Sequence, residues 1–206
     1  DIRNGRSALH ATAAADIMKP GSGALIQDPT LDVRISGERL FLEDFIDGMA
    51  GDLSIEGRIG GTATRPQGTL RLRGQRLDIG GQPLDSISVD AGMAGESITL
   101  DRLQAAVVPG ETIDGTGRID LARSAYDLRL SSQGVSLGSV RAVGGADQVS
   151  GKVALDVSGS GTFDDPRADG RIALTGLRIN GKPLADLQVR LSLKDRQARL
   201  WGQPGF

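Results

Sequence analysis

Residues 51–74 read GDLSIEGRIGGTATRPQGTLRLRG, and this stretch decides the fold. Apolar side chains stand at every second position, at Leu53 and Ile55 and again at Leu70 and Leu72, with polar residues between them. Successive side chains of a strand point to opposite faces, so the pattern predicts strands with one apolar and one polar face. The glycines and the proline between the two runs predict a tight turn that joins antiparallel neighbours.

The same alternation continues through most of the 206 residues, and turn signals such as Gly80-Gly81, Pro109-Gly110 and Asn180-Gly181 separate the runs. Continuous apolar runs, which are typical of parallel strands buried on both faces, are missing. We therefore predict roughly a dozen strands in a mainly antiparallel sheet, ~60 Å long at ~4.8 Å per strand and ~18 Å wide for five or six residues per strand.

Helical spacing is scarce. Leu42, Phe45, Ile46 and Met49 lie at helical intervals, and they predict one helix over 40–49. A short turn is expected at 137–143, where neighbouring glycines oppose a longer helix.

An internal repeat extends the pattern. Residues 51–56 (GDLSIE) align with 151–156 (GKVALD), and the match continues through the Gly-Thr, Pro and Gly-x-Pro-Leu positions that follow. Repeated strand-turn units predict a stack that grows in one direction. We expect a single elongated unit over residues 1–206, with two internal copies at approximately 1–100 and 101–206. A duplication within an ordinary β-sandwich is the alternative.

An apolar sheet face must be covered, and amphipathic helices that could cover this one are nearly absent. A long array of strands also twists and curls. We therefore predict an all-β fold in which a long, curled, mainly antiparallel sheet forms an elongated, taco-like groove with an apolar interior. Such a lining suits acyl chains, which need apolar contact and no hydrogen-bond partner. The residues expected to line the groove are Leu53, Ile55, Leu70, Leu72, Ile87, Val89, Leu128, Leu130, Val153, Leu155, Val157, Ile172, Leu174, Leu187, Val189, Leu191 and Leu193.

The order of these motifs resembles the TamB and AsmA-like proteins of Gram-negative envelopes. The resemblance rests on Gly61-Thr62, Pro66 and 68–72 in the first copy, and on the equivalent 161–174 in the second. It implies a β-groove in the periplasm, a parent protein held at the inner membrane by a segment absent from this chain, and a role in moving phospholipids towards the outer membrane. It also implies a link to an outer-membrane barrel of the Omp85 family, and it brings no catalytic residues.

The amino-acid composition argues against several other classes of function. The net charge is −2, with 24 basic and 26 acidic residues, and aromatic residues make up 3%. Nucleic-acid binding usually needs a basic face or stacking aromatics, so we expect no such partner. The chain has no cysteine and a single histidine, His10, so disulfides and zinc-thiolate sites are excluded and no cofactor is expected.

Gly134-Val135-Ser136-Leu137-Gly138 matches the Gly-x-Ser-x-Gly pattern of a nucleophile elbow. That elbow needs a following helix and a histidine later in the chain, whereas His10 lies far upstream. A strand followed by a turn is the preferred interpretation, and we predict that the chain is not an enzyme.

Asp164, Asp165 and Asp169 form an acidic cluster that could suggest a cation. The equivalent turn of the first copy has no carboxylate, and a calcium loop needs more regular oxygen spacing, so a turn is preferred and no metal is predicted. The Gly159-x-Gly161 doublet lacks the helix that a phosphate site requires. Trp201 leaves two options open, packing inside the groove or against a continuation of the sheet.

Three functions remain. The first is an envelope-spanning module that shields phospholipid acyl chains between the inner and outer membranes and assists outer-membrane protein assembly. The second is a scaffold that binds strands of outer-membrane proteins or an Omp85-type barrel without carrying lipid. The third is a spacer with a closed sandwich core. The lipid species, and the direction and energy source of transport, have no signature in the sequence.

Overall fold

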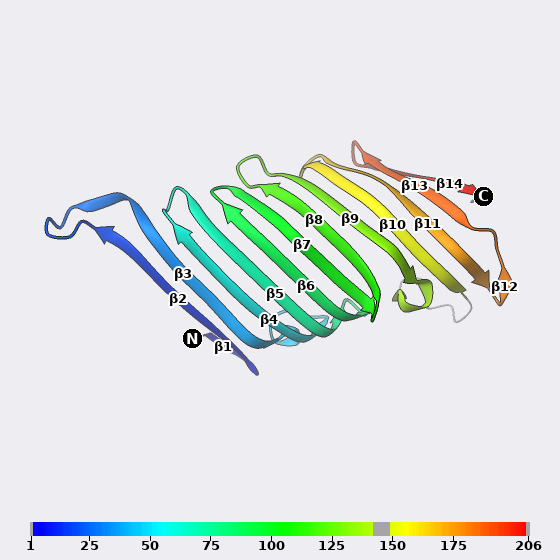
Figure 1. The fold of residues 1–206 in the computed structure, drawn as a ribbon, viewed down its shortest axis with the longest axis horizontal. Coiled ribbons are helices and arrows are strands. Elements are labelled where there is room, and N and C mark those ends of the chain that lie inside the picture. The colour runs from blue at the N-terminus through cyan, green and yellow to red at the C-terminus, as the bar shows by residue number, and fades with distance from the viewer. Residues whose placement is uncertain (1, 142–148, 205–206) are drawn as a thin grey trace.

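The computed structural model describes residues 2–141 and 149–204, and their strands form one open antiparallel sheet that follows the chain from end to end (Figure 1). Each strand pairs with the next, except that β12 pairs only with β11 and β11 continues to β13. This confirms the predicted all-β fold and curled, groove-like sheet. The strands are β1 (Ile2–Asn4), β2 (Ser7–Met18), β3 (Leu25–Phe41), β4 (Met49–Gly61), β5 (Pro66–Ile79), β6 (Gln82–Ala94), β7 (Ser97–Val108), β8 (Glu111–Asp120), β9 (Ala125–Ser136), β10 (Val149–Thr162), β11 (Pro166–Ile179), β12 (Lys182–Pro183), β13 (Leu187–Lys194) and β14 (Gln197–Pro204).

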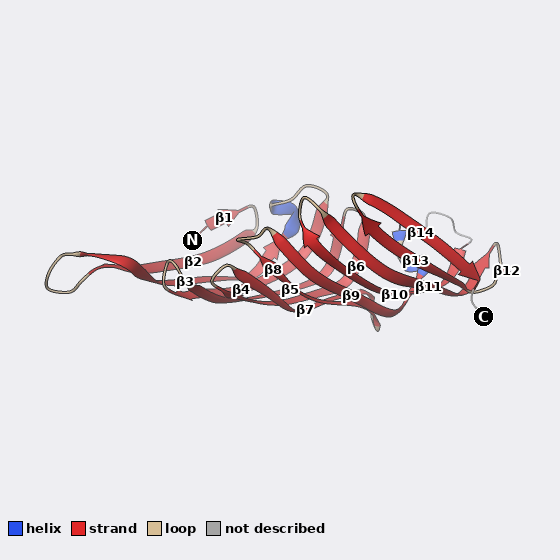
Figure 2. Ribbon diagram, turned by 90° about the horizontal axis from the view of Figure 1, so that it is seen from above, coloured by secondary structure: helices blue, strands red, loops and turns tan. Residues whose placement is uncertain are grey.

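The sheet is a single layer. Extensive contacts join only strands that are neighbours in the sheet, or a 3-10 turn and the strand beside it. Figure 2 shows the two 3-10 turns, η1 (Leu42–Asp44) and η2 (Leu137–Ser139), with no helix across the sheet in the part of the chain that the structure describes. A closed sandwich core, the third alternative above, is therefore absent from the described residues.

The strands are longer than the sequence suggested. β3 has 17 residues, β4 has 13 and β5 has 14, rather than five or six. At ~3.3 Å per residue, 13 residues span ~43 Å along the strand, more than twice the expected width. The estimate was wrong because glycines such as Gly57 and Gly68 occupy apolar-face positions within the strands, so that the apolar runs look shorter than the strands are.

The two long rims of the sheet differ. The hairpin rim holds the short turns after β2, β4, β6, β8, β10 and β13, and the packed rim holds the turns after β3, β5, β7, β9 and β11. Both η1 and η2 lie at the packed rim. The buried hydrophobic side chains among the described residues all lie near the packed rim; they are Leu40, Leu77, Ala106, Val107, Val135 and Leu137.

Irregular pairing near the packed rim bends the strands. The register of β4 with β5 shifts at Gly51, and that of β10 with β11 shifts at Gly151, the equivalent position of the second copy. Both glycines have positive φ, 121° and 142°, and a Cβ on Gly51 would lie 2.6 Å from the carbonyl oxygen of Arg76. Only glycine fits this conformation and approach. Bulges bend a strand and increase its twist, so they curl the sheet at the packed rim.

The helix predicted over 40–49 is wrong. β3 continues to Phe41 and only Leu42–Asp44 form a 3-10 turn, while Phe45 and Ile46 remain 49% and 46% exposed. Strand pairing of Leu40 with Leu53 overrides the helical spacing. The short turn expected at 137–143 begins as η2, and residues 142 and 143 lie outside the described residues.

Asp44 explains why the chain turns there. Its carboxylate accepts hydrogen bonds from the backbone N–H groups of Arg6 and Ser7, at 2.9 and 3.0 Å, and from the Ser7 hydroxyl at 2.7 Å. The Ser7 oxygen in turn accepts the N–H of Phe41 at 2.8 Å. These bonds join the start of β2 to the end of β3. The Ser7 hydroxyl and the two N–H groups hold the pKa of Asp44 below its usual value.

This carboxylate predicts acid-labile folding. Because the pKa of Asp44 is lower in the folded than in the unfolded chain, its stabilising effect is present above the unfolded pKa of about 4 and is lost as the pH falls through the folded pKa. Asp28, bonded to Thr62 and Thr64, and Glu111, bonded to Ser136, have lowered pKa values as well and act in the same direction.

The free energy of unfolding, measured by urea titration between pH 7 and pH 2, is therefore expected to fall as the pH drops below about 4. Asp44→Asn should flatten that decline, whereas Asp85→Asn, at an exposed carboxylate of β6, should leave it unchanged. Equal pH profiles for Asp44→Asn and the wild type would contradict the assignment.

Candidate apolar groove

The strand register places all the predicted lining residues on one face, called here the inner face. Across the middle of the sheet, Ile55 lies opposite Leu72, Leu72 opposite Val89, and Val89 opposite Leu103. In the second copy, Leu155, Ile172 and Val189 are opposite one another in the same way. Residues in register share a face, so these rows form a continuous apolar surface from the first copy to the second.

The side chains of the inner face are only partly shielded from solvent. None of the predicted lining residues is buried, and Leu70 and Leu130 are each 37% exposed. The curl of the sheet and the neighbouring side chains exclude part of the solvent, but no second layer among the described residues excludes the rest. A contiguous exposed apolar surface usually marks a site where something apolar binds.

Glycines alternate with large side chains along the inner rows. Gly57 lies between Ile35 and Leu70, and Gly117 lies between Leu100 and Leu128. A Cβ on Gly117 would contact the Leu128 side chain closely and lie 2.6 Å from the carbonyl oxygen of Asp127. The alternation of small and large residues lets the inner side chains fit together on a concave surface.

Glycines on the opposite, outer face have more room. A Cβ on Gly92 would have its nearest neighbour at 3.6 Å, and one on Gly60 at 3.7 Å, which are ordinary contact distances. On the inner face, a Cβ on Gly170 would lie 2.7 Å from Val157. The closest approaches at Gly117 and Gly170 are therefore tighter than those at Gly92 and Gly60, as is expected where a sheet curls towards its apolar side.

A hollow of about 200 Å³ lies on the inner face near the hairpin rim. It is lined by apolar side chains, among them residues that belong to the same alternation but were not predicted as lining. The signal that would have found them is that same alternation of apolar and polar residues. The apolar side chains around the hollow are those of Val33, Ile35, Ile59, Leu70, Ala91, Met93 and Ile98.

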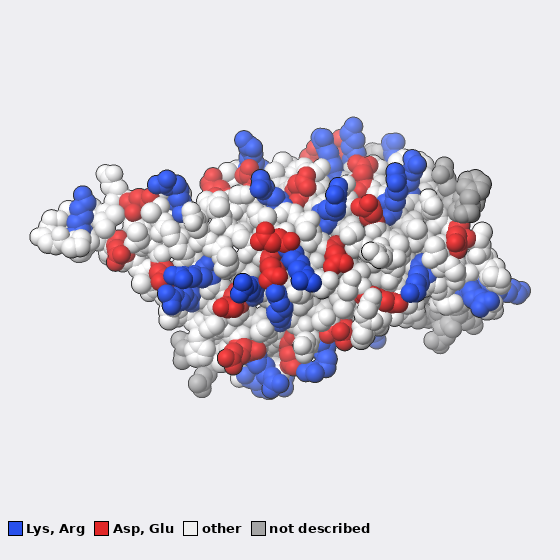
Figure 3. All heavy atoms as spheres, viewed as in Figure 1, with Lys and Arg blue, Asp and Glu red and all other residues white. Residues whose placement is uncertain are grey.

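The outer face is polar and charged. Arg73 donates two hydrogen bonds to Asp90, at 2.7 and 2.9 Å, and Arg71 lies 3.9 Å from Glu56. Figure 3 shows basic and acidic side chains side by side over the strands of one face. Such exposed pairs add little stability, but they keep this face in water.

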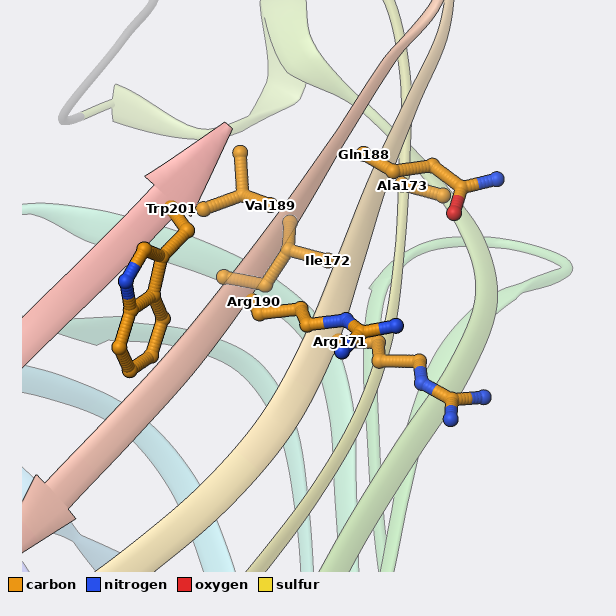
Figure 4. A pocket seen from close by; sticks show the side chains of 7 residues that line it. All are labelled: Arg171, Ile172, Ala173, Gln188, Val189, Arg190 and Trp201. Carbon is orange, nitrogen blue, oxygen red and sulfur yellow. The ribbon is translucent and has the colours of Figure 1, made fainter. Parts of the chain in front are cut away.

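Trp201 belongs to the outer face. Of the two positions that the sequence allows, this excludes the one inside the groove. Trp201 is 49% exposed and lies opposite Arg190, which lies opposite Arg171. In Figure 4, Ile172 and Val189 point away from the side taken by these arginines. Trp201 does not pack inside the groove, and a hollow of about 660 Å³ opens beside it.

The Gly-x-Ser-x-Gly segment serves a structural role. Ser136 ends β9, its hydroxyl donates to Glu111 at 2.7 Å, and its N–H donates to the same carboxylate at 2.7 Å. These bonds, together with the Lys152 ammonium 3.7 Å away, lower the pKa of Glu111. His10 lies in β2, several strands distant in the sheet, so Ser136 has no histidine beside it.

The acidic cluster and the glycine doublet form turns and strands. Asp165 accepts a bond from Arg167 at 2.9 Å, and the carbonyl oxygen of Asp164 accepts bonds from Arg196 at 3.0 and 3.2 Å. No group of three or more acidic, histidine or cysteine side chains within residues 2–141 and 149–204 is arranged to hold a metal ion. Gly159 and Gly161 lie within β10.

Comparisons of the chain with protein-family models, with curated proteins and with solved structures found no match. The geometry of the inner face therefore carries the functional argument. Within the described residues, no helix is both long and apolar enough to cross a membrane.

Proposed function

We propose that this chain is a lipid-transfer module that shields phospholipid acyl chains in its apolar groove between the inner and outer membranes of a Gram-negative envelope. The observation that supports it most is the inner face itself: rows of Leu, Ile and Val that run across successive strands and stay partly open to solvent. Acyl chains would lie against these rows while headgroups remain in water.

The lining also suits movement more than storage. Contact with the inner face provides ~0.8 kcal/mol per buried CH₂, before ordering costs. Neighbouring positions along the rows offer nearly the same apolar contacts, so a chain shifted along the groove gains and loses little. The resemblance to the TamB and AsmA-like proteins adds three parts to this proposal. The chain acts in the periplasm, its parent protein is held in the inner membrane by another segment, and an Omp85-family barrel is its partner at the outer membrane.

The direct test is photo-crosslinking with purified chain and phospholipid vesicles. A crosslinking residue at Leu155 or Leu174, on the inner face, is expected to capture phospholipid, whereas one at Arg190, on the outer face, is not. The measurement is the mass of lipid-protein adducts. Equal capture at Leu155 and Arg190, or none at either inner position, would overturn the proposal.

A second function, a scaffold for strands of outer-membrane proteins, is supported by a different observation. Within residues 2–141 and 149–204 the sheet stays open, so a client strand can lie in the groove or add to an edge. Competition separates the two functions: bound phospholipid should block a client that occupies the groove and should leave an edge-bound client in place.

A further inference from the structure

A row of charged side chains crosses the outer face of the first copy. The register sets Glu56 opposite Arg71 and Arg71 opposite Asp90. Arg102 lies on the other side of Asp90, so that negative and positive side chains alternate along the row. Arg71 lies 3.9 Å from both Glu56 and Asp90. Opposite charges that face each other across two strands favour the pairing of those strands.

The equivalent row of the second copy does not keep this alternation. Asp156 lies opposite Arg171, as in the first copy. Arg190 then stands where the first copy has Asp90, so that two guanidinium groups are directly opposed across β11 and β13. Like charges in this position disfavour the pairing of the strands. An anion bound between the two arginines would remove that repulsion.

No carboxylate takes the place of such an anion within the part of the chain that the structure describes. Arg171 and Arg190 are both exposed, and neither forms an ion pair or a side-chain hydrogen bond there. Asp156 and Asp169 are their neighbours in the sheet, opposite and diagonal, but neither carboxylate is paired with either arginine. The donors of both guanidinium groups are therefore available to a ligand.

The outer face is hollowed around these two arginines. In Figure 4 their side chains extend to the same side of the strands, away from Ile172 and Val189. Hollows of about 660 and 460 Å³ open beside them. Gln188 and Ser192, two positions to either side of Arg190, line these hollows and add an amide and a hydroxyl donor. Since β11 and β13 have partner strands on both sides, this site does not depend on an edge of the sheet.

The chemistry of the guanidinium group indicates the ligand. Each guanidinium presents its donors as a planar fork that binds two oxygens of a carboxylate or a phosphate. One fork occupies both oxygens of a carboxylate, whereas a phosphate group has further oxygens for a second fork. Two opposed arginines therefore fit a phosphate group better than a carboxylate.

We propose that Arg171 and Arg190 bind a phosphate group on the outer face of the second copy, with Gln188 and Ser192 as neutral donors. A lipid headgroup and free phosphate share this chemistry. The inference goes beyond the proposed function, because the site lies on the face opposite the apolar groove and requires no acyl chain.

Isothermal titration calorimetry at low ionic strength tests the site with inorganic phosphate and with glycerophosphoglycerol, a lipid headgroup without acyl chains. Arg190→Asp, which restores the alternation of the first copy, is expected to weaken binding about tenfold or more. Arg171→Gln removes the other guanidinium without adding a carboxylate and should weaken binding as well. The matched control, Arg178→Asp, makes the same change of charge in β11, opposite Ser150 and Pro183, and should bind as the wild type does.

A urea titration separates loss of the site from loss of the fold. Because Arg190→Asp removes a like-charge pair, its urea midpoint should equal or exceed that of the wild type. Tighter binding of glycerophosphoglycerol would assign the site to lipid headgroups, and tighter binding of inorganic phosphate would assign it to the free ion. If the wild type binds neither ligand, or if Arg190→Asp and Arg178→Asp weaken binding equally, the proposal is wrong. Neither result bears on lipid capture at Leu155, so the two proposals can fail separately.

Discussion

Replacing Gly117 with alanine is expected to lower the free energy of unfolding by about 2 kcal/mol, as overpacked sites in well-packed proteins do. The added methyl group would contact the Leu128 side chain closely, and would lie 2.6 Å from the carbonyl oxygen of Asp127 and 3.1 Å from the Cα of Leu128. Backbone atoms cannot rotate away as a side chain can. The strands β8 and β9 would have to separate locally, which would weaken their hydrogen bonds.

The measurement is a urea titration followed by far-ultraviolet circular dichroism. Gly138→Ala is the matched control, because a Cβ there has no neighbour within 4 Å and its φ is not positive. Its expected midpoint is that of the wild type. If both variants unfold at the same urea concentration, the inner face is not packed as the distances indicate.

The second large effect concerns binding. Leu155→Gln keeps nearly the same side-chain volume but sets an amide on the inner face, where an acyl chain would cover it without a hydrogen-bond partner. Desolvating an unpaired amide costs about 2 kcal/mol in proteins, which corresponds to roughly 30-fold weaker binding of a fluorescent fatty acid. The fold should tolerate the change because Leu155 is only half-buried.

The matched control is Ser158→Gln, in the same strand but on the outer face, opposite Asp169. It adds the same side chain, and the affinity should stay that of the wild type. Equal affinities for both variants would show that the probe binds elsewhere. Unchanged urea midpoints for both variants would show that the loss arises in the groove rather than from unfolding.

Much of the fold was readable from the sequence because strand alternation is local. Each pair such as Leu53 and Ile55 sets which face of its own strand is apolar, and the turns set the antiparallel order. The register then brings all the predicted lining residues to one face. Their contact with lipid stays a prediction.

The sequence-based predictions failed where residues distant in the chain determine the local structure. Helical spacing over 40–49 gave way to the pairing of Leu40 with Leu53 and to the Asp44 carboxylate, whose partners lie more than 35 positions away in the chain. The sequence allows two positions for Trp201, and the alternation of Ala198 and Leu200 on the inner face puts Trp201 on the outer one. The difference between the two rims depends on bulges, which the sequence marks only by glycines such as Gly51.

The lack of contact between the first and last strands has an evolutionary consequence. A barrel has a fixed circumference, but an open stack has no preferred number of units. One copy of this repeat contributes about six strands, or ~29 Å at ~4.8 Å each, whatever precedes or follows it. Tandem duplication can therefore change the length of such a sheet without redesigning its cross-section.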